Sequence, residues 1–196
     1  MATRLMLIRH GSTAWNQSGR YCGFRDIRLN ARGKKEARGA HNMLKKEKVY
    51  RVYSSDRKRA VETCKIIFRD RATERMPDLR EIHFGIFEGL TYPEIMHKYP
   101  GFSTRWSRNP FGATIPQGES MADFKKRVVS AFRKILSLNI NKTVAVVCHG
   151  GTISIFVNSI LKKKDFWGYI PKPASLTVVI FKNNKAKIER FSSLSK

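Results

Sequence analysis

An apolar run, TVAVVC at residues 143–148, is followed directly by HGGT at residues 149–152. A short continuous run of this kind is typical of a buried strand at a central, parallel position of a sheet. The residues after it predict a helix with one apolar face, formed by Ile153, Phe156, Val157 and Ile160. The segment therefore predicts a strand that leads into a helix, which is the repeating unit of an α/β fold.

The same alternation of strand and helix patterns extends along the chain. Further strands are expected at Leu5–Ile8 and Arg51–Tyr53. Helices are expected at Gly33–Lys46, after Asp56 as a capping residue, and after a capping signal formed by Ser120 and Asp123. The chain is expected to close with a hairpin, whose strands 176–181 and 186–191 flank Asn183-Asn184.

This order predicts an α/β fold, a three-layer αβα sandwich with a mostly parallel central sheet. With 196 residues, 41% of them hydrophobic, the chain is long enough for one domain spanning 1–196. Residues 91–118 interrupt the alternation and hold four prolines, Pro93, Pro100, Pro110 and Pro116. We expect them to belong to a short inserted lid, at about 86–118, over one end of the sheet.

Composition limits the class of protein. The chain has 39 Lys and Arg against 15 Asp and Glu, so its net charge of +24 attracts anions without choosing among them. Cys22, Cys64 and Cys148 are odd in number and far apart, which favours a reducing cytoplasm over a disulfide framework. No apolar run approaches the length of a membrane span, and no secretory leader is apparent, so we expect a cytoplasmic protein without a membrane partner.

Two expected strands end in a histidine followed by glycine. The first gives LIRHGST at residues 7–13 and the second gives VVCHGGT at residues 146–152. Ligands of open α/β sheets bind beyond the carboxyl ends of the strands, so His10 and His149 should face each other across one pocket. Glycine lets the backbone turn sharply and leaves amides free to meet an anion. A third strand end, YSSDRKRA at residues 53–60, adds arginines at the start of a helix.

These segments together resemble the histidine phosphatase superfamily, in its phosphoglycerate-mutase-like branch, over nearly the whole chain. Arg9-His10-Gly11 resembles the family's signature triplet, continued by Thr13 and Asn16. The other matching segments follow in the family's order and are RYCGF at 20–24, LNARG at 29–33, SSDRKRA at 54–60, LREIHFG at 79–85, FEG at 87–89, GES at 118–120 and HGG at 149–151. The compact members, alpha-ribazole phosphatase and the broad-specificity phosphatases, are the most similar in organisation.

The resemblance implies a metal-independent phosphomonoester hydrolase that works through a phosphohistidine. His10 would attack phosphorus through a ring nitrogen, and Glu81 would protonate the leaving oxygen and then activate water. The phosphoryl oxygens would be held by Arg9, Arg59 and His149, with Asn16 and the Gly23 amide assisting. No cofactor is implied, and the five histidines lack short metal-ligand spacing, so no metal site is expected.

Physical chemistry supports parts of this assignment. Cationic neighbours should lower the pKa of His10 and keep it neutral for attack. His149 is expected to be protonated when the phosphate dianion arrives. A carboxyl group beside that dianion is pushed toward its acid form, so bound substrate should prepare Glu81 to donate a proton.

Several local alternatives stay open. Glu88 could serve as the acid or be a solvated surface charge, and Arg57 could bind phosphate in place of Arg59. Cys22 is expected to be a small spacer in the phosphate loop, with a catalytic thiolate as the alternative. Lys98 and Arg108 could bind a substrate carboxylate or second phosphate and so select the substrate, or they could simply be solvated. Phe102 and Trp106 are expected to pack within the lid.

Three functions therefore compete. A phosphatase acting on a small phosphorylated metabolite is favoured, because the segment between Gly85 and Gly118 is short. The first alternative is a cofactor-dependent phosphotransferase of the phosphoglycerate mutase type, which shares the core residues. The second is a polyanion or nucleic-acid binder, supported by the charge but by no nucleic-acid motif. The edge of the C-terminal hairpin could also pair with a second copy in a homodimer.

Overall fold

The computed structural model describes residues 2–69, 71–183 and 185–191. One six-stranded sheet has the order β3-β2-β4-β1-β5-β6. Its strands are β1 (Thr3–Arg9), β2 (Arg51–Ser54), β3 (Thr73–Arg75), β4 (Thr143–Cys148), β5 (Leu176–Lys182) and β6 (Lys185–Arg190). The first four are mutually parallel, whereas β5 and β6 continue the sheet as antiparallel strands. The expected α/β fold with a mostly parallel central sheet is confirmed.

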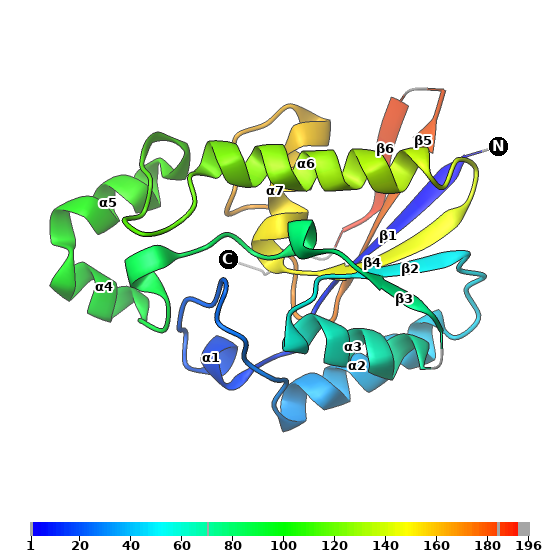
Figure 1. The fold of residues 1–196 in the computed structure, drawn as a ribbon, viewed down its shortest axis with the longest axis horizontal. Helices are drawn as coiled ribbons and strands as arrows, with labels where there is room; N and C mark the ends of the chain where they lie inside the picture. Colours follow the sequence, from blue (N-terminus) through cyan, green and yellow to red (C-terminus); the bar gives the residue numbers. More distant parts are fainter. Residues whose placement is uncertain (1, 70, 184, 192–196) are drawn as a thin grey trace.

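Helices cover both faces of the sheet. On one face lie α2 (Ala31–Leu44) and α3 (Lys58–Phe68), and on the other lie α6 (Met121–Ser137) and α7 (Gly150–Leu161) (Figure 1). A short helix, α1 (Ala14–Gln17), follows β1. The short 3-10 turns are η1 (Pro77–Leu79), η2 (Gly85–Phe87) and η3 (Pro110–Gly112). The arrangement is the expected three-layer αβα sandwich.

Two apolar cores separate the layers, because the side chains of each strand alternate between the faces. Met6 and Ile8 of β1 point toward α2 and α3, whereas Leu5 and Leu7 belong to the cluster beneath α6 and α7. All four of these side chains are fully buried. With both faces covered, β4 is apolar and fully buried from Val144 to Cys148, which explains why TVAVVC could be identified as a strand.

Strand β4 has the expected bounds and lies between β2 and β1, parallel to both. In its register with β1, Arg9 lies opposite Cys148. The next residue of each chain segment is a histidine, so His10 and His149 leave the sheet side by side. The topology thus creates the predicted juxtaposition of the two histidines.

Helix boundaries follow the capping residues. Ser120 caps α6 by accepting from the Asp123 amide, as predicted. Helix α2 begins two residues earlier than expected, because Asn30 accepts from the Gly33 amide and serves as its cap. The prediction that Asp56 caps α3 is wrong: Arg57 occupies that position, and the Asp56 carboxylate forms a salt bridge with Arg80.

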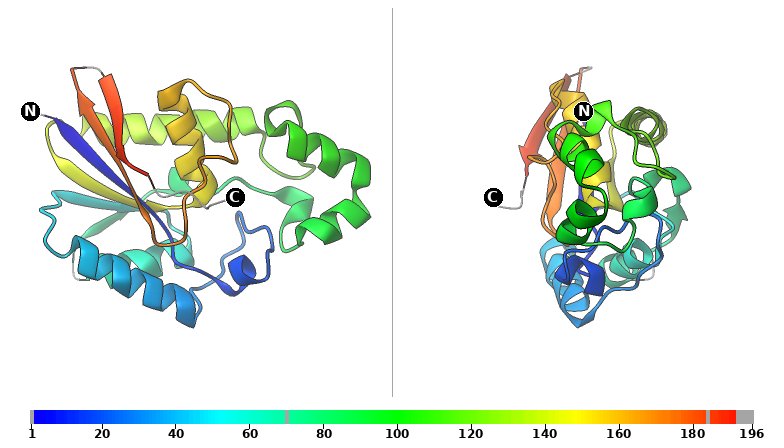
Figure 2. Two further views of the ribbon diagram at one scale, coloured as in Figure 1. Left: turned by 180° about the vertical axis from the view of Figure 1, so that it is seen from behind. Right: turned by 90° about the vertical axis from the view of Figure 1, so that its left-hand side faces the viewer.

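The region from Thr91 onward forms two helices, α4 (Tyr92–Lys98) and α5 (Pro100–Arg108). Seen from behind, they lie at the opposite end of the molecule from the β5–β6 hairpin (Figure 2). Trp106 is only 2% exposed and packs edge-on against Tyr21, Phe84, Phe87 and Trp167. Its expected packing role is therefore confirmed.

The C-terminal hairpin forms as expected, with strands that differ by one residue at each of three ends. Asn183 has a positive φ of 49°, which suits a turn. The other turn residue of the prediction, Asn184, falls outside the described residues. None of the helices described here is long and apolar enough to cross a membrane.

Candidate active site

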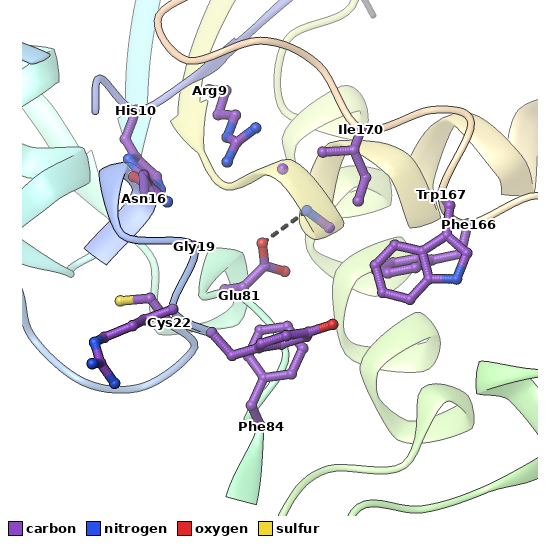
Figure 3. Close-up of a pocket in the computed structure, with 14 residues that line it drawn as sticks. Arg9, His10, Asn16, Gly19, Cys22, Glu81, Phe84, Phe166, Trp167 and Ile170 are labelled. Atoms are coloured by element: carbon purple, nitrogen blue, oxygen red, sulfur yellow. Dashed lines mark hydrogen bonds between the residues drawn. The ribbon is translucent and has the colours of Figure 1, made fainter. Parts of the chain in front are cut away.

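A cavity of about 180 Å³ opens at the carboxyl ends of β1 and β4 (Figure 3). The side chains of Arg9, His10 and Glu81 converge on it from two different segments of the chain. The whole lining consists of Arg9, His10, Asn16, Gly19, Arg20, Tyr21, Cys22, Glu81, Phe84, Gly150, Gly151, Phe166, Trp167 and Ile170. Its position is the one expected of a ligand site in an α/β sheet.

His10 is 4% exposed, and its Nδ1 lies 2.7 Å from the carbonyl oxygen of Gly11. A carbonyl can only accept, so Nδ1 carries the proton and Nε2 keeps its lone pair. Burial lowers the pKa of His10 well below its ordinary value, and the charges of Arg59 and Arg9 lower it further. The ring is therefore neutral, with Nε2 as the nucleophilic atom.

His149 is fully buried, and its ring centroid lies 5.2 Å from that of His10. Its Nδ1 accepts from Arg59 Nε at 3.2 Å, so its proton sits on Nε2, which donates to Ser55 Oγ at 2.8 Å. Burial and the Arg59 charge hold the pKa of His149 well below its ordinary range. The ring is therefore neutral in this arrangement, and protonation of His149 on arrival of the phosphate dianion stays a prediction.

Arg59 is fully buried at the start of α3. Its Nη1 donates to the Arg25 carbonyl at 2.8 Å, and its Nη2 donates to the carbonyls of Cys22 and Gly23 at 3.3 and 2.7 Å. Neither Arg59 nor His149 lines the cavity. The structure therefore brings both predicted residues beside His10, but with the guanidinium directed at loop carbonyls.

Glu81 lies between η1 and η2 and is 8% exposed. One carboxylate oxygen accepts from the Gly151 amide at 2.8 Å and the other from the Ile82 amide at 3.0 Å. Burial raises the pKa of Glu81, although the two amides and the nearby arginines oppose that shift. A buried carboxyl group with a raised pKa can hold a proton, as a general acid requires.

The two glycines of the HGG segment, Gly150 and Gly151, pack closely against charged side chains. A Cβ on Gly150 would lie 3.2 Å from Arg9 Nε, and a Cβ on Gly151 would lie 2.3 Å from Glu81 Oε1. Arg9 Nη1 donates to the Pro171 carbonyl at 2.7 Å, while Arg9 Nε is buried without a partner among the described residues. An unsatisfied cationic donor at a cavity is suited to an anion.

The loop of residues 20–25 forms another wall. Cys22 lines the cavity, but burial raises the pKa of its thiol to about 11. This disfavours the catalytic thiolate that the sequence left open. The Gly23 amide was expected to contact phosphate, but it donates to both Glu88 carboxylate oxygens at 3.1 Å and lies outside the lining.

The remaining predicted residues divide into two groups. Asn16 lines the cavity, and its Oδ1 accepts from Thr13 within the capping box of α1. Lys98 and Arg108 are exposed on α4 and α5 and do not line the cavity, so the structure does not bring them together with the other predicted residues, and their contact with substrate stays a prediction. Arg57 lies on the far side of the loop, against the ring of Phe24.

Sequence reasoning missed the apolar part of the cavity. Tyr21, Phe84, Phe166, Trp167 and Ile170 supply this wall from three separate segments. Only the aromatic pair Phe166-Trp167 gave a local signal, since it follows a lysine run at the end of α7. Within the described ranges, no group of three or more His, Cys, Asp or Glu side chains is placed to hold a metal ion.

Comparison with known proteins places this geometry in a family. The profile of the histidine phosphatase superfamily (branch 1) matches residues 5–193. The chain is 32% identical to phosphoserine phosphatase 1 of Hydrogenobacter thermophilus over 180 residues, covering 90% of this chain and 85% of that protein. It is 33% identical over 199 residues to the metal-independent phosphoserine phosphatase of Arabidopsis thaliana, covering 98% and 82%.

Solved structures agree with these matches. Phosphoserine phosphatase of Entamoeba histolytica, solved with 3-phosphoglyceric acid, superposes with a TM-score of 0.88 at 27% identity and 98% coverage of both chains. Phosphoglycerate mutases are also among the relatives. The match over nearly the whole length, together with the phosphatases among the relatives, shows that this chain belongs to branch 1 of the histidine phosphatase superfamily.

Proposed function

We propose that this chain hydrolyses a small phosphate monoester in the cavity, with His10 Nε2 as the nucleophile and Glu81 as the proton donor. The assignment rests on one observation: the side chains of His10 and Glu81 line the same cavity, and each has the protonation behaviour that its role requires. His10 presents a neutral ring with a free Nε2, and Glu81 presents a carboxyl group whose pKa is raised by burial.

In the first step, His10 Nε2 forms a bond to phosphorus while the ester P–O bond breaks. The departing oxygen takes the proton of Glu81, so it leaves as a neutral alcohol. In the second step, the Glu81 carboxylate takes a proton from water, whose oxygen attacks the phosphohistidine. The Nε2–P bond breaks, phosphate forms, and both side chains regain their initial states.

Positive charge around the transferred group takes the place that a metal ion has in other phosphoryl-transfer sites. Arg9 Nε, which has no hydrogen-bond partner within the described part of the chain, supports an oxygen-binding role at the cavity. Arg59 can join it if the guanidinium exchanges the loop carbonyls for phosphoryl oxygens. His149 can be protonated at Nδ1 only when Arg59 Nε no longer donates to that nitrogen. The same rotation of the guanidinium toward the phosphoryl oxygens would break this hydrogen bond.

The size of the cavity favours a small leaving group, and the relatives that carry the name phosphoserine phosphatase support phosphoserine as the first substrate to try. Helices α4 and α5 support the role of a lid at about 86–118 within a single domain, because Trp106 of α5 packs on the cavity residues Tyr21, Phe84 and Trp167.

The test is phosphate release from a panel of monoesters, including phosphoserine, phosphoglycerate and nucleotides, with a chelator present. Release that survives chelation and disappears in His10→Ala supports the proposal. Release that persists in His10→Ala would overturn it. Isomerisation of phosphoglycerate without net phosphate release would instead indicate the mutase reaction, and a band shift with nucleic acid but no turnover would indicate polyanion binding.

A further inference from the structure

Glu88 has a use that neither the proton-donor role nor a surface charge accounts for. It is half-buried, and its carboxylate accepts from four backbone amides. These are Gly23 at 3.1 Å, Phe24 at 2.7 Å, Arg25 at 3.4 Å and Phe84 at 3.2 Å. The carboxylate is therefore the shared acceptor of three consecutive loop amides and of one amide from the segment that carries Glu81.

The same loop is held from its other side by Arg59. Three loop carbonyls, those of Cys22, Gly23 and Arg25, accept from the Arg59 guanidinium. In residues 22–25, backbone amides therefore donate to the carboxylate of Glu88, and backbone carbonyls accept from the guanidinium of Arg59. The side chain of Cys22 and the neighbouring Tyr21 face the cavity from this loop.

Close packing at Gly23 shows that the anchor is tight. A Cβ at this position would lie 2.0 Å from the Ile82 carbonyl oxygen and 2.5 Å from Glu88 Oε1. Ile82 follows Glu81, whose carboxyl group lines the cavity. Glu88 thus ties the loop directly to the segment that carries the proton donor and Phe84.

We propose that Glu88 is a positioning residue that keeps the 22–25 loop on the Glu81–Phe84 segment while Arg59 exchanges loop carbonyls for phosphoryl oxygens. The inference rests on the proposed function. If Arg59 turns to the substrate, residues 22–25 lose their cationic anchor, while the carboxylate of Glu88 still holds the amides of residues 23–25.

The first test compares Glu88→Ala, Glu88→Gln and the matched control Glu62→Gln. Glu62 also accepts a backbone amide, that of Leu29, and pairs with Arg28, but it lies outside the cavity. We expect Glu88→Ala to lower kcat/KM about tenfold or more, mainly through KM. Glu88→Gln keeps one carbonyl acceptor and should recover part of the loss, whereas Glu62→Gln should match the wild type.

Leaving-group dependence separates positioning from acid catalysis. A lost proton donor slows alkyl esters far more than p-nitrophenyl phosphate, whose leaving group needs no proton. We expect Glu88→Ala to slow both esters equally, with an unchanged pH profile. A selective loss on alkyl esters, or equal activity of Glu88→Ala and wild type, would overturn the proposal.

Hydrogen exchange of the whole enzyme tests the anchor without any activity. In Glu88→Ala, the amides of residues 23–25 should exchange at least about tenfold faster, while those of β4 and α7 keep their protection. Uniform acceleration across the molecule would show a general loss of stability and would overturn the positioning role. This readout also holds if no ester on the panel is hydrolysed, so the two proposals can fail separately.

Discussion

Arg59 donates its Nε–H to Nδ1 of His149 across 3.2 Å, and this contact fixes which nitrogen of His149 carries a proton. The second contact of the ring, from Nε2 to Ser55 Oγ at 2.8 Å, is consistent with the same tautomer. His149 is therefore a neutral side chain that stacks edge-on against His10. Its charge state depends on where the Arg59 guanidinium points, which couples the two residues.

Replacing Arg59 with lysine should separate charge from geometry. Lysine keeps the positive charge but lacks the planar fork that reaches Nδ1 and three loop carbonyls at once. We expect kcat/KM to fall by roughly 10² to 10³, the range seen when one charge-stabilising donor is removed from an active site. Steady-state kinetics on one ester measures this loss, and a drop of less than about threefold would contradict it.

The same substitution makes a spectroscopic prediction about His149. Without the Nε donor, Nδ1 is free to take a proton, so the pKa of His149 should rise from its depressed position. Titration of the ring by NMR in wild type and Arg59→Lys reports this directly. An unchanged His149 pKa in Arg59→Lys would show that burial alone sets the pKa.

The pH dependence of activity follows from His10. Because its pKa is held well below 6.5, the ring stays neutral and nucleophilic in mildly acidic solution. The midpoint of the acid limb of kcat/KM should therefore lie below pH 6.5. The profile is measured with an ester and corrected for the ionisation of that ester. A midpoint at or above 6.5 would mean that His10 has the pKa of an ordinary, solvated histidine.

The free energy of unfolding should depend on pH through the two buried histidines, His10 and His149. Their folded pKa values lie below the unfolded value, so on acidification below about pH 6.5 the unfolded chain binds protons more readily than the folded one. The free energy of unfolding should therefore fall as the pH drops below 6.5. Urea unfolding of wild type and His10→Gln at pH 5 and 7 measures this, and we expect a smaller pH effect in the variant.

The glycines of HGG give a sharp test of the proton donor. Gly151→Ala places a Cβ 2.3 Å from Glu81 Oε1, so the carboxyl group must move. We expect activity on alkyl esters to fall by about 10² or more while p-nitrophenyl phosphate is affected much less. The matched control is Gly39→Ala on the exposed side of α2, where a Cβ meets nothing within 4 Å.

Gly39→Ala should keep full activity and raise the free energy of unfolding by about 0.5–1 kcal/mol, since alanine favours helix over glycine. Loss of activity in both variants would point to a general effect of the added methyl group. Equal slowing of both esters in Gly151→Ala would contradict a specific displacement of Glu81.

Much of the fold could be predicted from sequence because its signals are local. The strand at 143–148 lies between two parallel neighbours and under helices on both faces, so the positions from Val144 to Cys148 are all apolar. The Ser120 cap needs only an amide three residues away. Asp56 failed as a cap because a distant residue, Arg80, competes for its carboxylate, and no local pattern shows that competition.

The residues of the site also fall into those that local sequence signals predict and those that depend on contacts between distant segments. His10, His149, Arg9 and Gly151 follow from two strand ends that register places together. Glu81 was identified by resemblance, since its approach to Gly151 depends on the path of a segment without regular structure. The aromatic wall and the Glu88 anchor join segments that are 60 or more residues apart, as Gly23 and Glu88 show with a separation of 65. Periodicity carries no information on such contacts.

Substrate selection should lie with this aromatic wall and not with the exposed cations of the inserted segment. Trp167 lines the cavity, is 41% exposed and packs on Trp106 at 5.2 Å. Trp167→Ala should change the ranking of esters by kcat/KM, whereas Lys98→Ala and Arg108→Ala should leave it as in wild type. A changed ranking in Arg108→Ala would show that α5 moves its arginine to the substrate.

The net charge of +24 should raise the rate at which an anionic substrate encounters the enzyme. Dispersed positive charge draws an anionic ester toward the cavity, and added salt screens this attraction over a Debye length of about 10 Å at 0.1 M. We expect kcat/KM to fall with ionic strength while kcat stays constant, because saturation removes the encounter step. Chloride and acetate salts should act alike at equal ionic strength, since screening does not depend on the anion. A stronger effect of one anion would indicate competition at Arg9, and a flat profile would show that steering does not contribute to turnover.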